Sequence, residues 1–337
     1  MRVVRAFPLL LALCAVFASA QASSGAAPVA VPDVSVFYYP WYGTPARDGG
    51  WVHWTRPDTT SYASNYYPAR GLYSSSDARV VLAQMQEIAG AGIQEVVSSW
   101  WGWGSPEDRR LPLVISAARL SHVSVAAHLE PYPGRDVLTV QSDIEHLQQL
   151  GIRRFFVYHP FDISDADWTA LRDSVQGIQL FAETTLIGHA AAAHFDGVYT
   201  YDIVNRGAGT FDRFCKAAHK LKLLCLPSVG PGYDATRATG DKRIKPRRDG
   251  KTYDSMWKAA IHSKPDGVTI TSYNEWHEGT QIEPARARPP GNAAKLSYES
   301  YEGAYGLHGK AAERAYLGRT RFWVHAFGRS ERPDEPG

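Results

Sequence analysis

Short apolar runs rich in β-branched and aromatic residues alternate along the chain with longer segments whose apolar residues recur at helical spacing. The pattern predicts eight strands: Val34–Tyr39, Gln94–Ser99, Val123–Leu129, Arg153–Tyr158, Ile178–Ala182, Gly197–Thr200, Leu223–Val229 and the first half of Gly267–Pro284. The predicted helices between and after them are Asp77–Ala89, Asp108–Leu120, Val137–Leu150, Asp165–Val175, Leu186–His194, Phe211–Leu221, Tyr253–His262 and Lys310–Phe327.

Strands that alternate with helices over this length predict an α/β fold, a single (β/α)8 barrel of the TIM type. A doubly wound open sheet is the alternative. It is disfavoured because no glycine-rich phosphate turn follows any strand and because the long loops all follow strands, on one side. The predicted barrel domain covers residues 33–327, and residues 328–337 are predicted to form a disordered tail.

The N-terminus has the features of a cleavable signal peptide over residues 1–20. Arg2 and Arg5 precede the apolar run Leu9–Phe17, and Ala18–Ala20 fits a small-residue cleavage site. The run is too short to span a bilayer, so a membrane anchor is disfavoured. Residues 21–32, rich in Ala, Ser, Gly and Pro, are predicted to be a flexible leader. We therefore expect a secreted or periplasmic protein with no membrane attachment after cleavage.

Charge and cysteine content narrow the function classes. Cleavage would remove two of the 36 basic residues and none of the 34 acidic ones, so the mature chain has a net charge near zero. Such a balance does not favour nucleic acid as a partner. Cys215 and Cys225 remain after cleavage; they could pair in an oxidising compartment or stay as two buried thiols. No zinc-ligand spacing is present, and His277–Glu278 is not an HExxH motif, so we expect no metal or other cofactor.

The stretch Gly267–Pro284 begins as a strand and ends in polar chemistry. Glu275, Glu278 and Glu283 follow its β-branched half within nine positions, interspersed with aromatic and amide side chains. A solvated acidic loop is the simpler interpretation, but such a loop rarely carries Trp and Tyr beside its acids. A barrel strand that presents catalytic groups at its C-terminal end fits the composition better.

Aromatic and acidic residues follow most of the other predicted strands as well. Aromatic rings stack on sugar faces and carboxylates bind paired hydroxyls, so a carbohydrate site is indicated, and two carboxyl groups in a sugar groove suggest glycoside hydrolysis. A Ser-His-Asp hydrolase is disfavoured because no GxSxG motif is present. The residues expected at this face are Tyr38, Tyr39, Trp41, Trp51, Trp54, Trp100, Trp101, Trp103, Glu130, Tyr132, Tyr158, Tyr199, Tyr233, Glu275, Trp276 and Glu278.

Several of these segments resemble glycoside hydrolase family 99, the family of endo-α-1,2-mannosidases and endo-α-1,2-mannanases. The resemblance covers roughly Val34 to Phe327, and the last of its motifs is highly specific. It is carried by Phe37–Gly43, Trp51–Trp54, Glu130–Arg135, Phe195–Tyr201, Pro227–Tyr233 and Asn274–Pro284.

The resemblance implies a (β/α)8 barrel without a metal that cleaves internal α-mannosidic linkages with retention. It implies that Glu275 is the base and Glu278 the general acid/base, that Glu130 and Tyr199 line the pocket, and that the Trp100–Trp103 cluster helps set the −2 sugar. The basic segment Arg237–Lys251 departs from what the family leads us to expect. The complete set of predicted substrate-binding residues is Tyr38, Trp41, Trp54, Trp100, Trp101, Glu130, Tyr132, Tyr158, Tyr199, Tyr233, Asn274, Trp276 and His277.

The predicted partner is an oligosaccharide or polysaccharide that contains α-mannose. Two alternatives stay open at this point: a hydrolase of another α-glycan on the same barrel, and a non-catalytic carbohydrate-binding protein. The presence of both catalytic-type glutamates weighs against the second.

Overall fold

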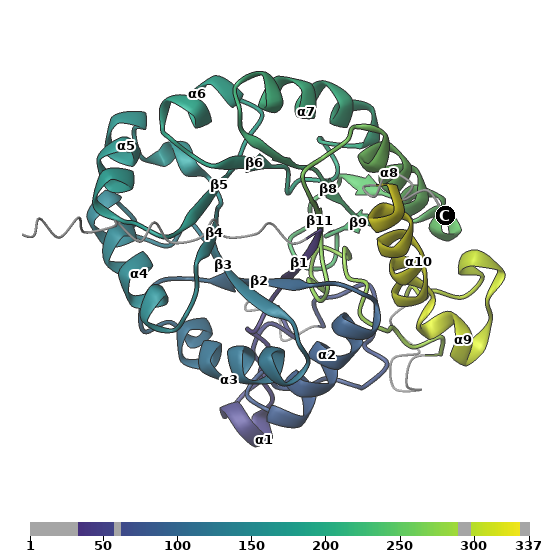
Figure 1. Cartoon of the computed structure of the whole chain (residues 1–337). Helices are drawn as coiled ribbons and strands as arrows, with labels where there is room; N and C mark the ends of the chain where they lie inside the picture. The colour runs from purple at the N-terminus through teal and green to yellow at the C-terminus, as the bar shows by residue number, and fades with distance from the viewer. Residues whose placement is uncertain (1–32, 57–61, 289–297, 331–337) are drawn as a thin grey trace, which may run out of the picture.

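Parallel strands form a central ring that is surrounded by helices in the computed structural model (Figure 1). The structure describes residues 33–56, 62–288 and 298–330; the predicted signal peptide and leader, residues 1–32, lie outside it. Among the described residues, no helix is long and apolar enough to cross a bilayer.

The ring is built from nine strand pieces in the order β7-β6-β5-β4-β3-β2-β1-β11-β8. All neighbours are parallel, with Ser35 opposite Glu95 and Val34 opposite Val268. The pieces are β1 (Val34–Tyr38), β2 (Glu95–Trp100), β3 (Ser124–Leu129), β4 (Arg154–Val157), β5 (Gln179–Glu183), β6 (Gly197–Tyr199), β7 (Leu224–Leu226), β8 (Ser228–Val229) and β11 (Val268–Ile270).

The two ends of this order are consecutive in the chain, since only Pro227 separates β7 from β8. Proline has no N–H to donate, so a strand is interrupted where it occurs. The carbonyl of Pro227 still accepts a hydrogen bond from Thr269 N at 3.2 Å, next to the β8–β11 pairing. The pieces therefore fill eight strand positions, and the predicted (β/α)8 barrel is confirmed.

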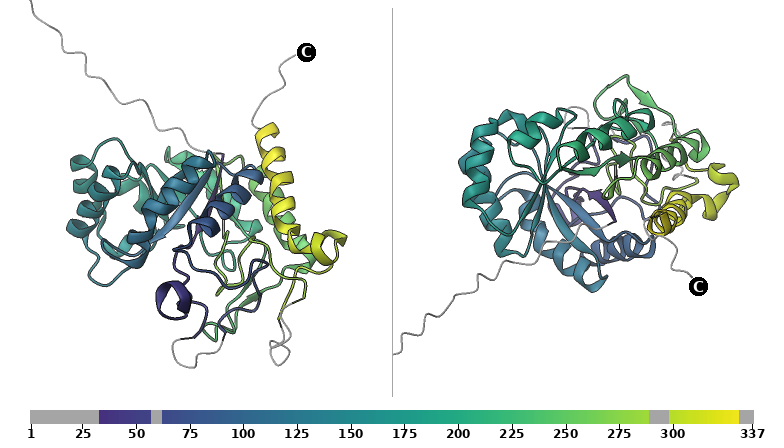
Figure 2. Two further views of the ribbon diagram at one scale, coloured as in Figure 1. Left: turned by 90° about the horizontal axis from the view of Figure 1, so that it is seen from below. Right: turned by 45° about the horizontal axis from the view of Figure 1, so that its top comes forward.

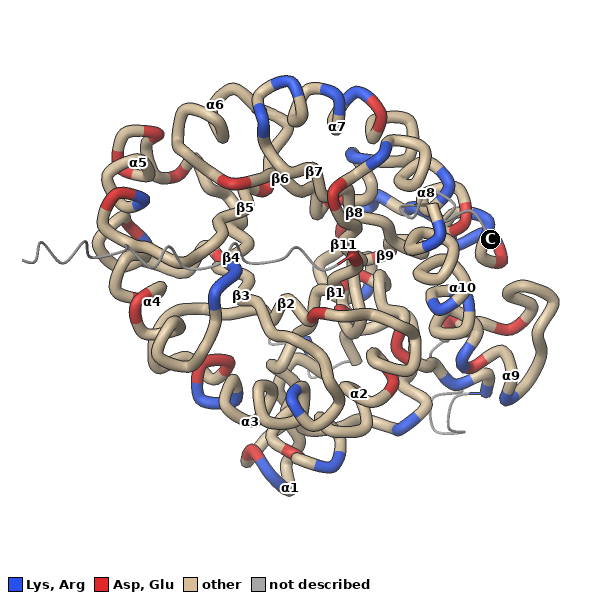
Figure 3. The backbone as a smooth tube through the Cα atoms, viewed as in Figure 1, with Lys and Arg blue, Asp and Glu red and all other residues tan. Residues whose placement is uncertain are grey.

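Helices follow the strands and cover the outside of the ring, and α10 lies beside α8 and α2 where the first and last strands meet (Figure 1). Lys and Arg are interspersed with Asp and Glu around this outer layer (Figure 3). The helices are α1 (Pro45–Asp48), α2 (Ala78–Gly90), α3 (Pro106–Leu120), α4 (Val137–Gln149), α5 (Asp165–Ser174), α6 (Ile187–Ala192), α7 (Phe211–Lys220), α8 (Lys251–His262), α9 (Gly309–Glu313) and α10 (Ala315–Ser330).

One feature of the fold differs from the sequence predictions, and another answers a question that the sequence left open. The closing helix continues to Ser330, so residues 328–330 are helical rather than part of a disordered tail; residues 331–337 are not described. Cys215 on α7 and Cys225 on β7 form a disulfide, with their Cα atoms 5.2 Å apart. That settles the question of pairing that the sequence left open.

Side chains inside the ring form an aromatic core that is distinct from the core between strands and helices. Because successive strand residues point to opposite sides, Phe37 lies inside the ring while Val36 and Tyr38 face the helices. At the N-terminal end of the barrel, Arg154 pairs with Glu95 at 2.6 Å. The inner core consists of Phe37, Tyr39, Val97, Ala126, Phe156, Phe181, Tyr199, Tyr201 and Leu226.

The long loops extend from the end of the barrel where the strands finish. In Figure 2 the purple segment with α1 projects from the same end as the green loops of the second half. One of these loops contains a small antiparallel hairpin, β9 (Tyr233–Asp234) with β10 (Ile244–Lys245), whose second strand lies in the basic segment that the sequence left unassigned. These loops enclose the carboxylates that follow β11.

Candidate active site

The loop after β11 is folded back on itself and carries the two predicted catalytic residues. Ser272 N donates to Thr280 O at 3.0 Å, and Ile282 N donates to Ser272 O at 2.9 Å. The Ser272 hydroxyl accepts from Glu275 N at 2.8 Å. These bonds form a tight turn that holds Glu275 and Glu278 at the C-terminal end of the strand, where barrel enzymes place their catalytic groups.

Glu275 and Glu278 are buried close enough to influence each other's ionisation. Burial raises the pKa of Glu275 well above its usual range, and the negative charge of Glu278 raises it further. Burial also raises the pKa of Glu278 to about 7, with Glu130 and Asp202 adding to the rise. Two like charges in one buried site do not ionise together easily, so near neutral pH the pair shares one proton.

The hydrogen-bond donors favour Glu275 as the ionised member. His277 N donates to Glu275 Oε1 at 2.9 Å, and the Glu278 N–H also stabilises this carboxylate. Glu278 instead accepts one side-chain bond, from the Tyr201 hydroxyl at 3.1 Å. Donors to a carboxylate stabilise its anion, so the shared proton resides on Glu278.

Two tyrosines lie near Glu278: Tyr39, which was expected at this face but not among the substrate-binding residues, and Tyr201, which was not expected there. The hydroxyl groups of Tyr39 and Tyr201 are 2.5 Å apart, and Tyr201 continues the chain to Glu278. Both side chains project into the ring, as Tyr199 does. Strand alternation was the signal available, because Phe37 and Tyr39 share one face of β1 while Tyr38 lies on the other.

Glu130, at the end of β3, belongs to a second polar chain on the same side of the barrel. Ser99 Oγ donates to Glu130 Oε1 at 2.8 Å, and Trp101 Nε1 donates to Ser99 Oγ at 3.2 Å. His128 Nδ1 lies 3.0 Å from the same glutamate oxygen, and its Nε2 is 2.9 Å from the Tyr199 hydroxyl. Glu130, Ser99 and Trp101 are thus joined by hydrogen bonds, and His128 lies between Glu130 and Tyr199.

A small cavity opens beside Glu278. Tyr158 and Tyr233 line it, together with Asp202 and Arg243. The Tyr233 hydroxyl donates to Asp241 at 2.9 Å, which fixes its ring on the β9–β10 hairpin. Tyr158 and Tyr233 are therefore in the site, as predicted, while the sequence did not identify Asp202 or Arg243 as neighbours of the acid.

His277 and Trp41 form a stack at the edge of the site. Trp41 lies parallel to His53 with ring centroids 4.4 Å apart, and His277 lies 6.1 Å from Trp41. Burial lowers the pKa of His53 to about 3 and lowers that of His277 as well. Both imidazoles are therefore neutral near pH 7, and they extend an aromatic wall rather than supply charge.

Trp101 and Tyr132 lie at the rim, beyond the ends of β2 and β3, and both are half-buried. The Tyr132 ring packs 3.4 Å from where a side chain at Gly102 would begin. The Tyr132 hydroxyl donates to Asp143 on α4. This contact holds the Tyr132 ring beside the turn that carries Trp101.

Six residues predicted to bind substrate are fully buried and use their polar atoms within the protein, which corrects the prediction. Tyr38 faces the helices and donates to Gln84 at 2.6 Å. The Asn274 amide instead clamps the backbone N–H and C=O of residue 39, joining the ends of β1 and β11. The six are Tyr38, Trp54, Trp100, Tyr199, Asn274 and Trp276, all 1% exposed or less.

The three buried tryptophans cannot donate hydrogen bonds to a substrate, because each indole N–H already binds an acceptor within the protein. Trp54 donates to Tyr73 O at 2.7 Å, Trp100 to Asp108 at 3.0 Å, and Trp276 to Glu283 at 2.9 Å. Sequence proximity to a strand end does not separate such side chains from exposed ones, because both types follow the same strands.

The candidate site contains a carboxyl pair, a third carboxylate and several tyrosines. Among the described residues, no group of three or more His, Cys, Asp or Glu is arranged to hold a metal ion. A (β/α)8 barrel with paired carboxyl groups and aromatic walls at the C-terminal ends of its strands has the architecture of a glycoside hydrolase.

Comparison with known proteins identifies the family. The model of glycosyl hydrolase family 99 matches residues 32–329. Because that match covers most of the chain, the protein belongs to glycosyl hydrolase family 99. It is 32% identical over 361 residues to the glycoprotein endo-alpha-1,2-mannosidase-like protein of Danio rerio, covering 89% of this chain and 79% of the relative.

Other relatives agree. The glycoprotein endo-alpha-1,2-mannosidase of Xenopus laevis is 29% identical, with 88% of this chain and 77% of the relative covered. The solved GH99 endo-alpha-mannosidase from Bacteroides thetaiotaomicron matches with a TM-score of 0.79 and 28% identity, covering 90% of this chain and 100% of that chain. The resemblance inferred from the motifs is thereby confirmed.

Proposed function

We propose that this protein is an endo-acting, retaining hydrolase of α-1,2-mannosidic linkages within a larger glycan. The observation that carries the proposal is the pair Glu275 and Glu278, held on one turn at the end of β11, where burial raises the pKa of both carboxyl groups. The names of the family 99 relatives support mannose as the sugar. The substrate is a glucosylated high-mannose glycan or an α-mannan.

The spacing of the pair argues against the usual double displacement. In most retaining enzymes the acid and the nucleophile flank the scissile bond about 5 Å apart, on opposite sides of the sugar. Glu275 and Glu278 are instead three residues apart on one turn, so their backbones are at most about 10 Å apart. That spacing does not by itself place one carboxylate beneath C1, and the resemblance to family 99 implies another route, in which Glu275 acts on the sugar's own 2-hydroxyl.

In the first step, the Glu275 carboxylate removes the proton from the 2-hydroxyl of the mannose. That oxygen attacks C1, the bond from C1 to the leaving oxygen breaks, and Glu278 gives its proton to the leaving group. The products are a 1,2-anhydro sugar and the free alcohol. In an α-mannoside the axial 2-hydroxyl is trans to the leaving group, which is the geometry that this attack requires.

In the second step, the Glu278 carboxylate removes a proton from water, and the water oxygen attacks C1. The bond from C1 to O2 breaks, and Glu275 returns its proton to O2. Two inversions at C1 give net retention, and both glutamates recover their starting protonation states. Tyr201 donates to Glu278 at 3.1 Å and stabilises the carboxylate that forms between the steps.

Product analysis separates this proposal from its rivals. The protein is incubated with α-1,2-linked mannan oligosaccharides, with a glucosylated high-mannose glycan and with an α-glucan, and the released fragments are sized. We expect internal cleavage of the mannosides alone. Release from the α-glucan alone would favour a hydrolase of another α-glycan, and binding without release would favour a carbohydrate-binding protein.

The mechanism has its own test. Enzyme quenched during turnover is analysed by mass spectrometry, and we expect no sugar attached to the protein. A substrate that lacks the 2-hydroxyl should not be cleaved, while a matched analogue altered at another hydroxyl remains a substrate. A glycosyl adduct on Glu275 would overturn the anhydro route and leave the hydrolase assignment intact.

We also propose that the protein functions outside the cytoplasm, as its N-terminal sequence predicts. The disulfide between Cys215 and Cys225 supports this, because such bonds persist in oxidising compartments. N-terminal sequencing of the exported protein should find a start near Gln21. A cell-retained chain that still begins at Met1 would contradict the proposal.

A further inference from the structure

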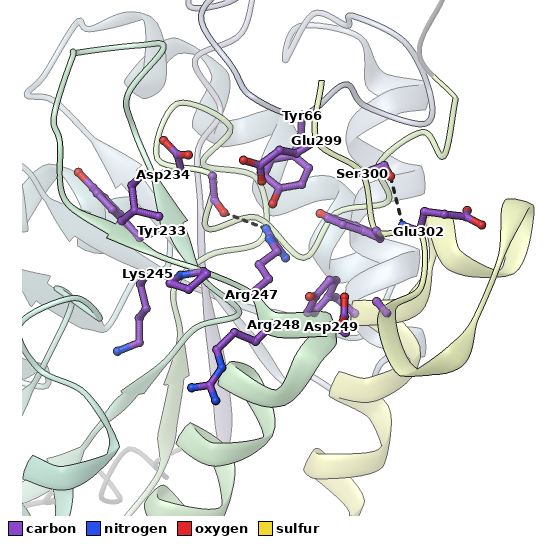
Figure 4. A pocket seen from close by; sticks show the side chains of 16 residues that line it. Tyr66, Tyr233, Asp234, Lys245, Arg247, Arg248, Asp249, Glu299, Ser300 and Glu302 are labelled. Atoms are coloured by element: carbon purple, nitrogen blue, oxygen red, sulfur yellow. Dashed lines mark hydrogen bonds between the residues drawn. The ribbon is translucent and has the colours of Figure 1, made fainter. Parts of the chain in front are cut away.

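Arg247 lies beneath the loop that carries Glu278 and belongs to the basic segment with no assigned role. It is 8% exposed, and its guanidinium is enclosed by three tyrosine rings. The guanidinium carbon lies 4.8 Å from the ring centres of Tyr66 and Tyr301 and 4.5 Å from that of Tyr316. Figure 4 shows Arg247 in the pocket, with Tyr66 near it. Contacts of this kind hold a cation in a fixed orientation.

The guanidinium binds the backbone of the catalytic loop directly. Arg247 Nη2 donates to Gly279 O at 2.9 Å and to Gln281 O at 2.7 Å. The preceding carbonyl, that of Glu278, accepts from Asp234 N at 2.8 Å. Three carbonyls between residues 278 and 281 are therefore held by the hairpin segment on which Arg247 resides.

The turn at Gly279 makes this attachment tight. Gly279 has a φ of +63°, in the left-handed region, and a side chain there would lie 3.1 Å from Asp234 O. The Tyr301 hydroxyl also donates to Gln281 O at 3.0 Å, so one member of the ring cage binds the same carbonyl as Arg247. The loop and the hairpin are thus joined at closely spaced points beside the Glu278 side chain.

We propose that Arg247 is a positioning residue that holds the Glu278–Gln281 turn so that Glu278 stays in place for proton transfer. The inference rests on the proposed function of Glu278. Arg247 acts through the backbone, because its nitrogen donates to carbonyls and not to a carboxylate. A lysine in its place would keep the charge but lacks the planar group that packs among the three rings and fixes Nη2 between the two carbonyls.

The test compares Arg247→Lys with Arg319→Lys. Arg319 is a matched control because it also stacks on rings, with its guanidinium carbon 4.4 Å from the Phe322 ring centre, and it binds Asp254 on α8 rather than the catalytic loop. For Arg247→Lys we expect kcat on an α-1,2-mannoside to fall by about 10- to 100-fold, with KM little changed, since small misplacements of catalytic groups cost this much. Arg319→Lys should keep kcat even where its Tm falls.

Hydrogen exchange measured by mass spectrometry provides a readout that needs no substrate. In Arg247→Lys, amides of residues 274–283 should exchange faster than in the wild type, whereas in Arg319→Lys they should not. Tyr301→Phe keeps the ring over Arg247 and removes only its bonds to the loop, so it should accelerate exchange to a smaller extent and serves if the arginine variant does not fold.

The outcomes are separable. Unchanged kcat and unchanged exchange in a folded Arg247→Lys variant would overturn the positioning role, as would an equal loss of kcat in Arg319→Lys. A wild-type protein that cleaves no α-mannoside would overturn the proposed function, while the exchange comparison would still decide whether Arg247 holds the loop.

Discussion

Glu278 and Glu283 lie on the same loop, five residues apart; Glu283 is fully buried and Glu278 half-buried, and their hydrogen-bond partners differ. Glu283 accepts from Arg70 at 2.8 Å, Gln84 at 2.9 Å, Tyr73 at 2.7 Å and Trp276 at 2.9 Å. Glu278 accepts one side-chain bond, from Tyr201.

Burial raises the pKa of both groups, but the four donors decide the state of Glu283. Two donors point at each of its oxygens, so a proton on either oxygen would face another hydrogen, and the arginine charge balances the anion. Glu283 is therefore a fixed structural anion. Glu278 is near other carboxylates and has few donors, so it can gain and lose a proton. Burial alone does not mark a catalytic carboxylate; the number of donors around it does.

The largest expected effect comes from removing the proton of the general acid. Glu278→Gln keeps the size of the side chain but cannot protonate a leaving group, so kcat on an unactivated substrate should fall by about 10²- to 10⁴-fold. Binding of an oligosaccharide, measured by calorimetry, should persist. Glu145→Gln, on an exposed position of α4, is the control and should leave kcat unchanged. Near-normal turnover by Glu278→Gln would remove it from this role.

Glu283→Gln should instead affect stability. The change leaves Arg70 without the partner at its Nε and places an amide N–H against other donors, and breaking a buried pair costs about 3–5 kcal/mol. We expect the free energy of unfolding in urea to fall by about 3 kcal/mol. This is the lower end of the range because Arg70 keeps its second partner, Glu87. A variant as stable as the wild type, with kcat lost, would show that the two carboxylates had been assigned the wrong way round.

The alternation of strands and helices made the barrel predictable, because each strand and helix carries its own local hydrophobic period. The break of the seventh strand at Pro227 changes its hydrogen bonds but not its place in the ring. The β9–β10 hairpin was not predictable, since each of its strands has two residues and its charged sequence shows no strand alternation.

The catalytic pair was recognisable because family resemblance and composition point to the same short segment. The roles of Trp54, Trp100 and Trp276 were not, because a tryptophan after a strand can point to the sugar or into the core. Their indole donors bind partners distant in the chain or on a neighbouring turn, such as Tyr73 O for Trp54. Those partners are known only once the chain is folded.

Tyr201→Phe tests the single donor of Glu278. The Tyr201 bond lowers the pKa of Glu278, so its loss should raise that pKa above the value of about 7. An acid must be protonated to act, so the activity of the wild type should fall as pH rises through about 7, and this limb should move to higher pH in the variant. We expect kcat/KM at the optimum to fall by about three- to tenfold. An unmoved limb in a pH profile of kcat/KM would argue against the contact.

The smallest effect is expected from a change at Tyr38. Comparison with the same change at its neighbour Tyr39 makes the result informative. Tyr38 donates to Gln84 Oε1, and Gln84 in turn donates to Glu283, so Tyr38→Phe removes a bond one step behind the structural carboxylate. It should lower the free energy of unfolding by about 1 kcal/mol and leave kcat/KM unchanged. Tyr39→Phe removes the hydroxyl 2.5 Å from that of Tyr201, on the catalytic side, and should alter kcat/KM more than stability. Urea denaturation and initial rates on both variants make the comparison. Because the two residues are adjacent on β1, the same effect from both would mean that strand alternation does not separate the structural from the catalytic side of the barrel.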